Sequence, residues 1–206
     1  SGTTHEMIDP VRYIANRSSG EQGSAIASAL VDLGANVIFI TGPSTAPIPA
    51  NVELIKVQSG REMHKAVLAQ LPADVAIFVA AVSDWYIDHV SEQKIKKNSN
   101  GPPVLKFNEN PDILRDVGNL KDDRPCLVIG FAAETEDLYK NAETKFKKKG
   151  CDWVIANDVS ATTGYMGSDE NKICLISAKQ KEDWPLMSKK SVAKKLAAKI
   201  CTALEV

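Results

Sequence analysis

The sequence lacks long apolar runs and paired cysteines. No stretch of its 206 residues approaches the ~20 apolar residues of a membrane-spanning helix, and the first residues do not form a signal peptide, so we expect no membrane contact. None of the four cysteines belongs to a C-x-x-C pair, which excludes the common zinc and redox motifs. We therefore expect reduced thiols in the core of a cytoplasmic protein, at Cys126, Cys151, Cys174 and Cys201.

An excess of one sign of charge is also absent. The 25 lysines and arginines nearly balance the 26 aspartates and glutamates, so no overall field attracts nucleic acid or an anionic membrane. Aromatic residues make up only 6% of the chain and form no stacking platform for single-stranded nucleic acid. A non-catalytic interaction module, in which lysine-rich segments bind a partner, remains an alternative. Salt-dependent binding of single-stranded nucleic acid would support it.

The order of apolar patterns predicts the fold class. Short runs rich in β-branched residues predict strands at residues 36–42, 51–57, 74–82, 125–132 and 151–156. Helical patterns lie between them, at about 20–33, from the Ser59 to Glu62 capping box onward, and from Asn110-Pro111 onward. This alternation predicts a Rossmann-like, mostly parallel sheet with helices on both faces, which binds its ligand at the carboxyl ends of the strands.

The two ends of the chain and one internal segment depart from this alternation. The run 173–177 and a short run near Trp184 predict a C-terminal β-hairpin, and a basic helix follows it. Residues 87–103 contain few apolar side chains, and we expect them to form a mobile strap. The first four residues are typical of a turn after a strand, so we expect a strand upstream of Ser1. We expect the whole of 1–206 to form a single nucleotide-binding domain.

The run 18–23, Ser-Ser-Gly-Glu-Gln-Gly, leads directly into the first predicted helix. Its small residues and the free N–H groups of a helix N-terminus suit a phosphate. It is not a P-loop, because no Gly-Lys-Ser/Thr follows, and it lacks the first glycine of G-x-G-x-x-G. By itself the run is explained equally well by a capped helix whose glycines allow close packing.

Polar residues follow three predicted strands, where a doubly wound sheet presents its binding residues. Asp84 ends the 74–82 strand, Gly-Phe-Ala-Ala-Glu-Thr at 130–135 ends a second, and residues 157–160 follow a third. Asp84 suits ribose hydroxyls or a magnesium ion, or else it caps a turn. All three segments are expected on the same edge of the sheet.

Two basic patterns complete the candidate site. Asn16 lies between Arg12 and Arg17 just before the first helix; an arginine fork suits phosphate or carboxylate, and an amide can hold a carbonyl oxygen. The run 94–97, Lys-Ile-Lys-Lys, lies in the strap, where it would neutralise charge on a transferred phosphoryl or nucleotidyl group. Each pattern also fits an ordinary solvated surface.

Seven short motifs occur in a characteristic order along nearly the entire chain: Asp-Pro-Val-Arg-Tyr-Ile at 9–14, Asn-Arg-Ser-Ser-Gly-x-x-Gly at 16–23, Ala-Ala-Val-Ser-Asp at 80–84, Lys-Ile-Lys-Lys at 94–97, Asn-Pro-Asp-Ile-Leu at 110–114, Gly-Phe-Ala-Ala-Glu-Thr at 130–135 and Ala-Asn-Asp-Val at 156–159. In this order they make the chain resemble the bacterial phosphopantothenoylcysteine synthetases. In many bacteria such a domain is the C-terminal half of a bifunctional protein, whose N-terminal half is a flavin (FMN)-dependent decarboxylase.

The resemblance implies a two-step ligase reaction that needs CTP and Mg²⁺. The carboxylate of 4′-phosphopantothenate attacks the α-phosphorus of CTP, which releases pyrophosphate and leaves an acyl-cytidylate. The amine of L-cysteine then displaces CMP and forms an amide. Activation is needed because a carboxylate is a poor acyl donor at neutral pH.

The resemblance also implies roles for individual residues. Asn16 would hold the acyl-cytidylate and assist its aminolysis, and Lys94 would contact the α-phosphate from the closing strap. Arg12 would lie near a homodimer interface, where the partner subunit helps complete the phosphopantothenate site. The remaining implied contacts are with the triphosphate, the ribose and the cytosine, the last chiefly through backbone atoms: Ser18, Ser19, Gly20 and Gly23, then Asp84, then Phe131.

The chain departs from the family pattern at one position of the glycine turn. Glu21 stands where bacterial members commonly have lysine, and a carboxylate there weakens triphosphate binding unless it points to solvent or holds magnesium. Another family type uses ATP, and the lysine strap favours CTP. The principal rival from a different class is an NAD(P)-binding oxidoreductase. The strand ending at residues 40–42 lacks the acidic residue that such enzymes place on the adenosine ribose.

Overall fold

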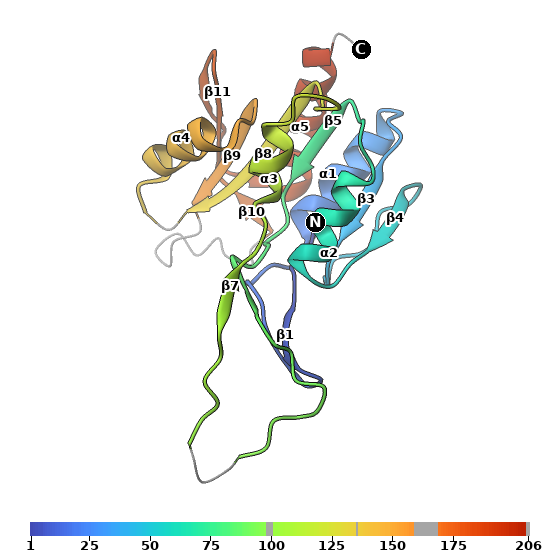
Figure 1. The fold of residues 1–206 in the computed structure, drawn as a ribbon. Helices are drawn as coiled ribbons and strands as arrows, with labels where there is room; N and C mark the ends of the chain where they lie inside the picture. The colour runs from blue at the N-terminus through green and yellow to red at the C-terminus, as the bar shows by residue number, and fades with distance from the viewer. Residues whose placement is uncertain (98–100, 135, 159–168, 205–206) are drawn as a thin grey trace.

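A five-stranded sheet forms the centre of the computed structural model, which describes residues 1–97, 101–134, 136–158 and 169–204 (Figure 1). The order of its strands is β12-β11-β9-β8-β5. The neighbours β5, β8 and β9 run parallel, and β11 and β12 add an antiparallel edge. Their bounds are Val75–Phe78 (β5), Leu127–Glu134 (β8), Trp153–Asp158 (β9), Ile173–Ser177 (β11) and Lys181–Asp183 (β12).

Four smaller strand pairs surround this sheet. A parallel pair lies beside β5 in Figure 1, and two antiparallel ribbons extend away from the sheet at the opposite end from the C-terminus. The pairs are β3 (Ile38–Thr41) with β4 (Glu53–Lys56), β1 (Glu6–Asp9) with β2 (Arg12–Ile14), β6 (Trp85–Ile87) with β7 (Phe107–Glu109), and β10 (Glu170–Asn171) with β13 (Met187–Ser188).

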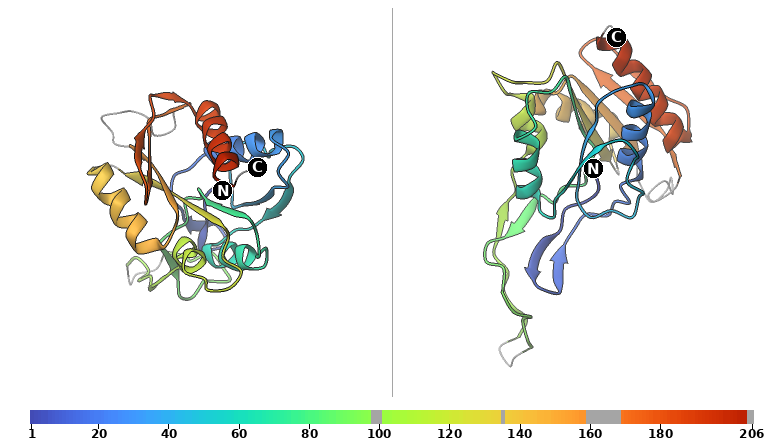
Figure 2. Two further views of the ribbon diagram at one scale, coloured as in Figure 1. Left: turned by 90° about the horizontal axis from the view of Figure 1, so that it is seen from above. Right: turned by 90° about the vertical axis from the view of Figure 1, so that its right-hand side faces the viewer.

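Helices cover both faces of the central sheet, as Figure 2 shows from two directions. Successive side chains of β8 explain why: Leu127 and Ile129 pack into one apolar cluster with α1 and α5, whereas Val128 packs into the other with α3 and α4. The predicted Rossmann-like sheet with helices on both faces is therefore confirmed. The helices are α1 (Glu21–Asp32), α2 (Gly60–Leu68), α3 (Ile113–Gly118), α4 (Leu138–Lys149) and α5 (Lys189–Leu204).

Two of the three predicted helices begin where their local sequence signals indicate. The first helix begins after Gly20 and stops before Gly34, whose φ of 88° is left-handed. Ser59 caps α2 by accepting a hydrogen bond from the N–H of Glu62 at 3.2 Å. The predicted cap Asn110 is wrong: its side chain donates to Ser83 O at 2.9 Å, and Asp112 caps α3 instead.

Three further expectations need correction. Residues 6–14 form the β1–β2 ribbon, which was not among the predicted strands, and the strap begins at the end of β6, where Ile87 is buried. The helix α4 was missed because its lysine-rich sequence leaves a narrow apolar stripe, in which only Ala142 is fully buried. Cys126 is exposed and Cys201 is half-buried, so only Cys151 and Cys174 are core thiols.

The C-terminal hairpin is confirmed. In it β11 pairs antiparallel with β12, and Trp184 follows with 1% of its surface exposed. The helix α5 then packs beside α1, with Val192, Leu196 and Ile200 buried against the sheet. In the part of the chain that the structure describes, no helix is both long enough and apolar enough to cross a bilayer.

The packing of α5 on the sheet yields a stability prediction. Leu196 is completely buried, so Leu196→Ala should lower the free energy of unfolding by about 2–5 kcal/mol, because it removes buried methyl groups and leaves a cavity. Leu186→Ala is the matched control, since 43% of Leu186 is exposed, and it should change stability by less than about 1 kcal/mol. Chemical denaturation measures both; equal losses would contradict the assigned packing.

Candidate active site

Asn16 is held at the carboxyl end of β5. Its side-chain Nδ2 donates to Val82 O at 2.9 Å, and its backbone oxygen lies 2.9 Å from Thr3 Oγ1. The same Thr3 hydroxyl lies 3.2 Å from Ala81 O. These contacts tie the segment before α1 to the strand end that leads to Asp84. Two motifs that are far apart in sequence therefore meet, as the family pattern implied.

The turn into α1 is built for close backbone approach. Gly20 has a left-handed φ of 79°, and a Cβ atom there would lie 2.2 Å from Ser44 Oγ, so the position excludes a side chain. Ser18 Oγ accepts from Gly20 N at 3.2 Å, and Ser19 O accepts from Ser44 Oγ at 2.7 Å. The first N–H groups of a helix carry partial positive charge, and a turn of this shape suits an anion.

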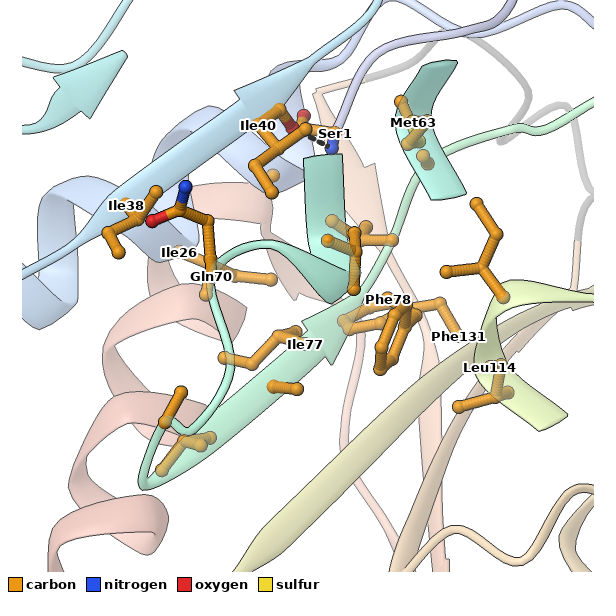
Figure 3. Close-up of a pocket in the computed structure, with 18 of the residues that line it drawn as sticks. Ser1, Ile26, Ile38, Ile40, Met63, Gln70, Ile77, Phe78, Leu114 and Phe131 are labelled. Atoms are coloured by element: carbon orange, nitrogen blue, oxygen red, sulfur yellow. Dashed lines mark hydrogen bonds between the residues drawn. The ribbon is translucent and has the colours of Figure 1, made fainter. Parts of the chain in front are cut away.

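Three of the predicted nucleotide-binding residues line one cavity of about 980 Å³: Gly23, Asp84 and Phe131. Figure 3 shows Phe131 among the side chains around this cavity. Gly23 comes from α1, Asp84 follows β5, and Phe131 lies on β8. Val82, which accepts the Asn16 amide, lines the same cavity. The parallel strands end at one edge of the sheet, which explains why these residues converge.

Lys145 is a site residue that the sequence reading missed. Its ammonium donates to Phe131 O at 2.6 Å and lines the cavity, although it comes from α4. Burial lowers the pKa of this lysine, since desolvation disfavours the charged form. The sequence marks it only by its spacing of three residues from Ala142. This spacing places both residues on the inner side of a helix that is otherwise rich in exposed lysine. Lys145 brings positive charge to the strand end expected to hold the cytosine.

The strap is clamped to the β1–β2 ribbon by a buried carboxylate. Asp9 has no exposed side-chain surface and accepts hydrogen bonds from the Arg12 guanidinium and from Ile95 N, the latter at 3.1 Å. Arg12 in turn donates to Ile95 O at 2.7 Å. The Arg12 hydrogen bonds hold the pKa of Asp9 far below its ordinary value. Arg12 and Asp9 therefore fix the position of the strap at Ile95. Lys94 is the residue just before Ile95 in the chain.

Lys94 itself is exposed and is not among the residues that line the cavity. Residues 98–100 of the strap lie outside the described part of the chain, as do Thr135 and Val159 from two of the strand-end motifs. Figure 1 shows that the strap region projects away from the sheet with the β1–β2 ribbon beside it. The structure thus brings Asn16 and Asp84 to one edge, but it does not place Lys94 there.

The unusual Glu21 is neutralised within the fold. Its carboxylate forms an ion pair with the ammonium of Lys189, at the start of α5, and this contact lowers the pKa of Glu21. The adjacent Gln22 donates to Lys189 O at 3.2 Å and accepts from Asn171. The negative charge in the glycine turn is therefore compensated by a cation from another helix.

The sequence of the chain also matches a known protein family. The sequence model of the family described as DNA/pantothenate metabolism flavoprotein C-terminal domain matches residues 1–204. The chain belongs to this family.

Two curated relatives of this chain carry the same name. The coenzyme A biosynthesis bifunctional protein CoaBC of Vibrio cholerae serotype O1 is 42% identical over 195 residues, which cover 94% of this chain and 49% of that protein. The protein of the same name from Escherichia coli (strain K12) is 40% identical over 205 residues, which cover 98% and 50%. The chain therefore spans about half the length of the curated relatives it matches.

Solved structures show the same fold. The crystal structure of the C-terminal domain of CoaBC matches with a TM-score of 0.82 at 34% identity, over 99% of this chain and 92% of that one. A DNA/pantothenate metabolism flavoprotein from Streptococcus pneumoniae matches with a TM-score of 0.81 at 24% identity, over 98% and 96%. A Cab2 mutant in complex with phosphopantothenate-cysteine matches with a TM-score of 0.72 at 14% identity, over 100% and 86%, which is a likeness of fold.

The clamp yields a prediction for the strap. Asp9→Asn keeps the size of the side chain but removes the charge bound by Arg12, so backbone amides of residues 88–97 should exchange with solvent faster. In the unaltered chain the pKa of Asp9 lies below its ordinary value of 3.8, so the clamp should be complete above about pH 4 and be lost as the pH falls further. Hydrogen exchange followed by mass spectrometry measures both effects.

The control for this prediction is Glu182→Gln, which weakens ion pairs with Lys195 and Lys199 on α5. It changes the same kind of charge, but Glu182 pairs with α5 and not with the strap, so exchange at residues 88–97 should stay unchanged. Unaltered strap exchange in Asp9→Asn would refute the clamp.

Proposed function

We propose that the chain is a CTP-dependent ligase that joins 4′-phosphopantothenate to L-cysteine in coenzyme A biosynthesis. The observation that carries the proposal is the hydrogen bond from Asn16 to Val82, which brings the anion-binding turn of α1 to the strand end that bears Asp84. Membership of the flavoprotein C-terminal domain family, and the name of the CoaBC relatives, support this chemistry over an NAD(P)-dependent oxidoreductase.

The first step activates the carboxylate. A carboxylate oxygen of 4′-phosphopantothenate bonds to the α-phosphorus of CTP, the bond to the β-phosphate oxygen breaks, and pyrophosphate leaves. Ser18, Ser19, Gly20 and Gly23 would hold the triphosphate at the positive end of α1, because free N–H groups there favour negative charge. Asp84 would bind the ribose and Phe131 the cytosine. Lys94 would reach the α-phosphate when the strap closes, and a cation there stabilises charge in the transition state.

The second step forms the amide. The amine of cysteine attacks the acyl carbon, the bond from that carbon to CMP breaks, and the amine loses a proton. An asparagine amide has two N–H donors, and Asn16 uses one for Val82 O. The other is available to hold the acyl oxygen as its negative charge develops. The contact with Val82 would keep the amide oriented for this task.

A magnesium ion would accompany the triphosphate. In the described ranges, no three His, Cys, Asp or Glu side chains gather into a group able to hold a metal ion. We infer that the ion would arrive with the nucleotide, since Mg²⁺ commonly keeps phosphate oxygens and water as ligands. When bound, it would draw charge away from the reacting phosphate.

The two ribbons support a homodimer. Four of their large apolar side chains are about half exposed: Val11, Tyr13, Trp85 and Phe107. Exposed apolar side chains that gather on projecting strands are typical of an interaction surface. A second subunit seated there would lie next to Arg12 and the strap, and would complete the phosphopantothenate site.

We further infer a cytoplasmic, single-domain enzyme that acts without FMN of its own. An FMN-dependent decarboxylase would be a separate domain in a longer parent chain.

The direct test of the ligase reaction is pyrophosphate release with Mg²⁺ and 4′-phosphopantothenate, comparing CTP with ATP, followed by addition of cysteine. CTP-selective release and cysteine-dependent amide formation are expected. Failure with both nucleotides in folded, dimeric protein would refute the proposal.

Asn16→Asp should separate the two steps. Aspartate has no N–H to donate, so the acyl-cytidylate should still form with release of pyrophosphate, while amide formation should slow by about 100-fold or more. Rapid quenching with separate quantification of pyrophosphate and amide product measures the two rates. Amide formation at the normal rate would remove Asn16 from the second step.

Lys94→Gln should instead suppress the first step. Loss of the cation should reduce pyrophosphate release by about 100-fold or more, because charge on the α-phosphate is then uncompensated. Lys97→Gln is the matched control, since it removes the same charge from an exposed position of the same strap and should keep most of the activity. Equal losses in both variants would mean that only the overall charge of the strap matters.

A further inference from the structure

Asp84 lies in a short segment between β5 and the β6–β7 ribbon, and the rest of the chain must hold this segment in place. Asp84 is exposed and lines the cavity of about 980 Å³. In the described ranges its carboxylate takes part in no hydrogen bond or ion pair, so it is free to accept from a ligand. A free carboxylate selects particular hydroxyl groups only if its own backbone has a fixed position.

Asn110 forms two hydrogen bonds to this segment. Its backbone N–H donates to Asp84 O at 2.8 Å, and its side-chain Nδ2 donates to Ser83 O at 2.9 Å. The first bond continues the antiparallel ribbon in which Trp85 of β6 pairs with Glu109 of β7. The second bond comes from the side chain and is not part of any ladder.

The two acceptors lie on either side of the Asp84 Cα atom. Ser83 O belongs to the peptide group before Asp84, and Asp84 O belongs to the peptide group after it. Because each peptide group is planar, fixing both of them fixes the backbone dihedral angles of the residue between them. Asn110 therefore sets the direction in which the Asp84 side chain leaves the backbone.

The surroundings of Asn110 fix the donor itself. A residue before proline is confined to extended backbone, and Pro111 thus keeps the Asn110 N–H in line with β7. The amide lies against Gly60 at the start of α2, where a Cβ atom would lie 3.1 Å from Asn110 Nδ2. Ser83 is 3% exposed, and its N–H donates to Thr4 Oγ1 at 3.0 Å. Figure 1 shows β7 running from the strap up toward α3, so these contacts lie at the base of the strap.

The other half of the Asn110 amide argues against a role in stability alone. Within the part of the chain that the structure describes, Asn110 Oδ1 is buried and has no hydrogen-bond partner. A buried acceptor without a partner is costly, so an asparagine is a poor choice here for packing alone. The position that the Nδ2 donor gives to Ser83 and Asp84 explains why an amide is present.

We propose that Asn110 is a positioning residue that sets Asp84 for the ribose hydroxyls of the nucleotide. The inference rests on the proposed function, because it takes the bound ligand to be a ribonucleotide. Asn110 acts through Asp84 and not by touching the ligand. Its loss should therefore weaken recognition of the hydroxyl groups and leave the contacts with the base and the phosphates unchanged.

The experiment compares the binding of CTP and 2′,3′-dideoxy-CTP, each with Mg²⁺, by titration calorimetry. The unaltered chain should bind CTP at least about tenfold more tightly, because the dideoxy nucleotide has no hydroxyl groups to donate to Asp84. Asn110→Ala should reduce this preference to about twofold or less by weakening CTP binding alone. Asp84→Ala should remove the preference, and the double variant should lose no more than Asp84→Ala does, because both act on one interaction.

Asn108→Ala is the matched control. Asn108 lies two residues earlier in the same strand, and its Nδ2 donates to Asp88 Oδ1 at 2.8 Å, on the strap side of the ribbon. This variant removes the same kind of hydrogen bond without touching the Asp84 segment, so the preference for CTP should stay. If Asn110→Ala does not fold, Asn110→Asp serves in its place, because it keeps the shape of the side chain and loses the Nδ2 donor.

Equal weakening of both nucleotides in Asn110→Ala would overturn the proposal, because it would show a general loss of structure. An unchanged preference would overturn it too, as would an equal loss of preference in Asn108→Ala. If the unaltered chain binds both nucleotides equally well, Asp84 does not read the ribose, and the role of Asn110 falls with it. Failure of the unaltered chain to bind either nucleotide would instead refute the proposed function and, with it, this inference.

Discussion

The backbone pairing of the first four residues is the contact on which the arrangement of the molecule depends. Ser1 pairs with β3, Gly2 and Thr3 pair with Ala81 beyond β5, and Thr4 Oγ1 accepts from Ser83 N at 3.0 Å. These bonds join two sheet parts that otherwise lack a common strand. They also set where Asn16 meets Val82, because Thr3 contacts the backbone of both neighbouring segments. The geometry of the candidate site is thus a consequence of how the chain enters the sheet.

Charged side chains in the molecule are compensated by neighbouring residues, and the net charge is close to zero. Formal charges nearly cancel, and two carboxylates, one at the strap and one at the start of α1, are each paired with a cation: Asp9 with Arg12 and Glu21 with Lys189. The partial positive charge at the N-terminus of α1 therefore lies beside a carboxylate that is already paired. Lys145 adds a cation at Phe131. Charges arranged in this way act over short distances and produce no strong overall field.

Local sequence patterns predicted the strands and helices whose structure depends mainly on their own residues. The strands β3, β4, β5, β8 and β9 and the helix α1 lie where apolar runs and glycine stop signals predicted them, because apolar periodicity reports burial directly. The errors have a physical cause as well. Asn110 looks like a helix cap, but its side chain donates instead to Ser83 O, in the segment between β5 and β6. The helix α4 hides its apolar stripe among lysines, and Cys126 is exposed although cysteine usually lies inside.

The sequence by itself determined the fold class, the family and the short motifs that carry the expected chemistry, since these depend on residue order and periodicity. Only the tertiary structure decided which of those motifs meet. It brought Asn16 to the end of β5, paired Glu21 with Lys189, recruited Lys145 from a distant helix and placed Arg12 against the strap instead of in the cavity. The reason is that hydrogen bonds and ion pairs between distant segments depend on how the layers pack, which no local spacing encodes.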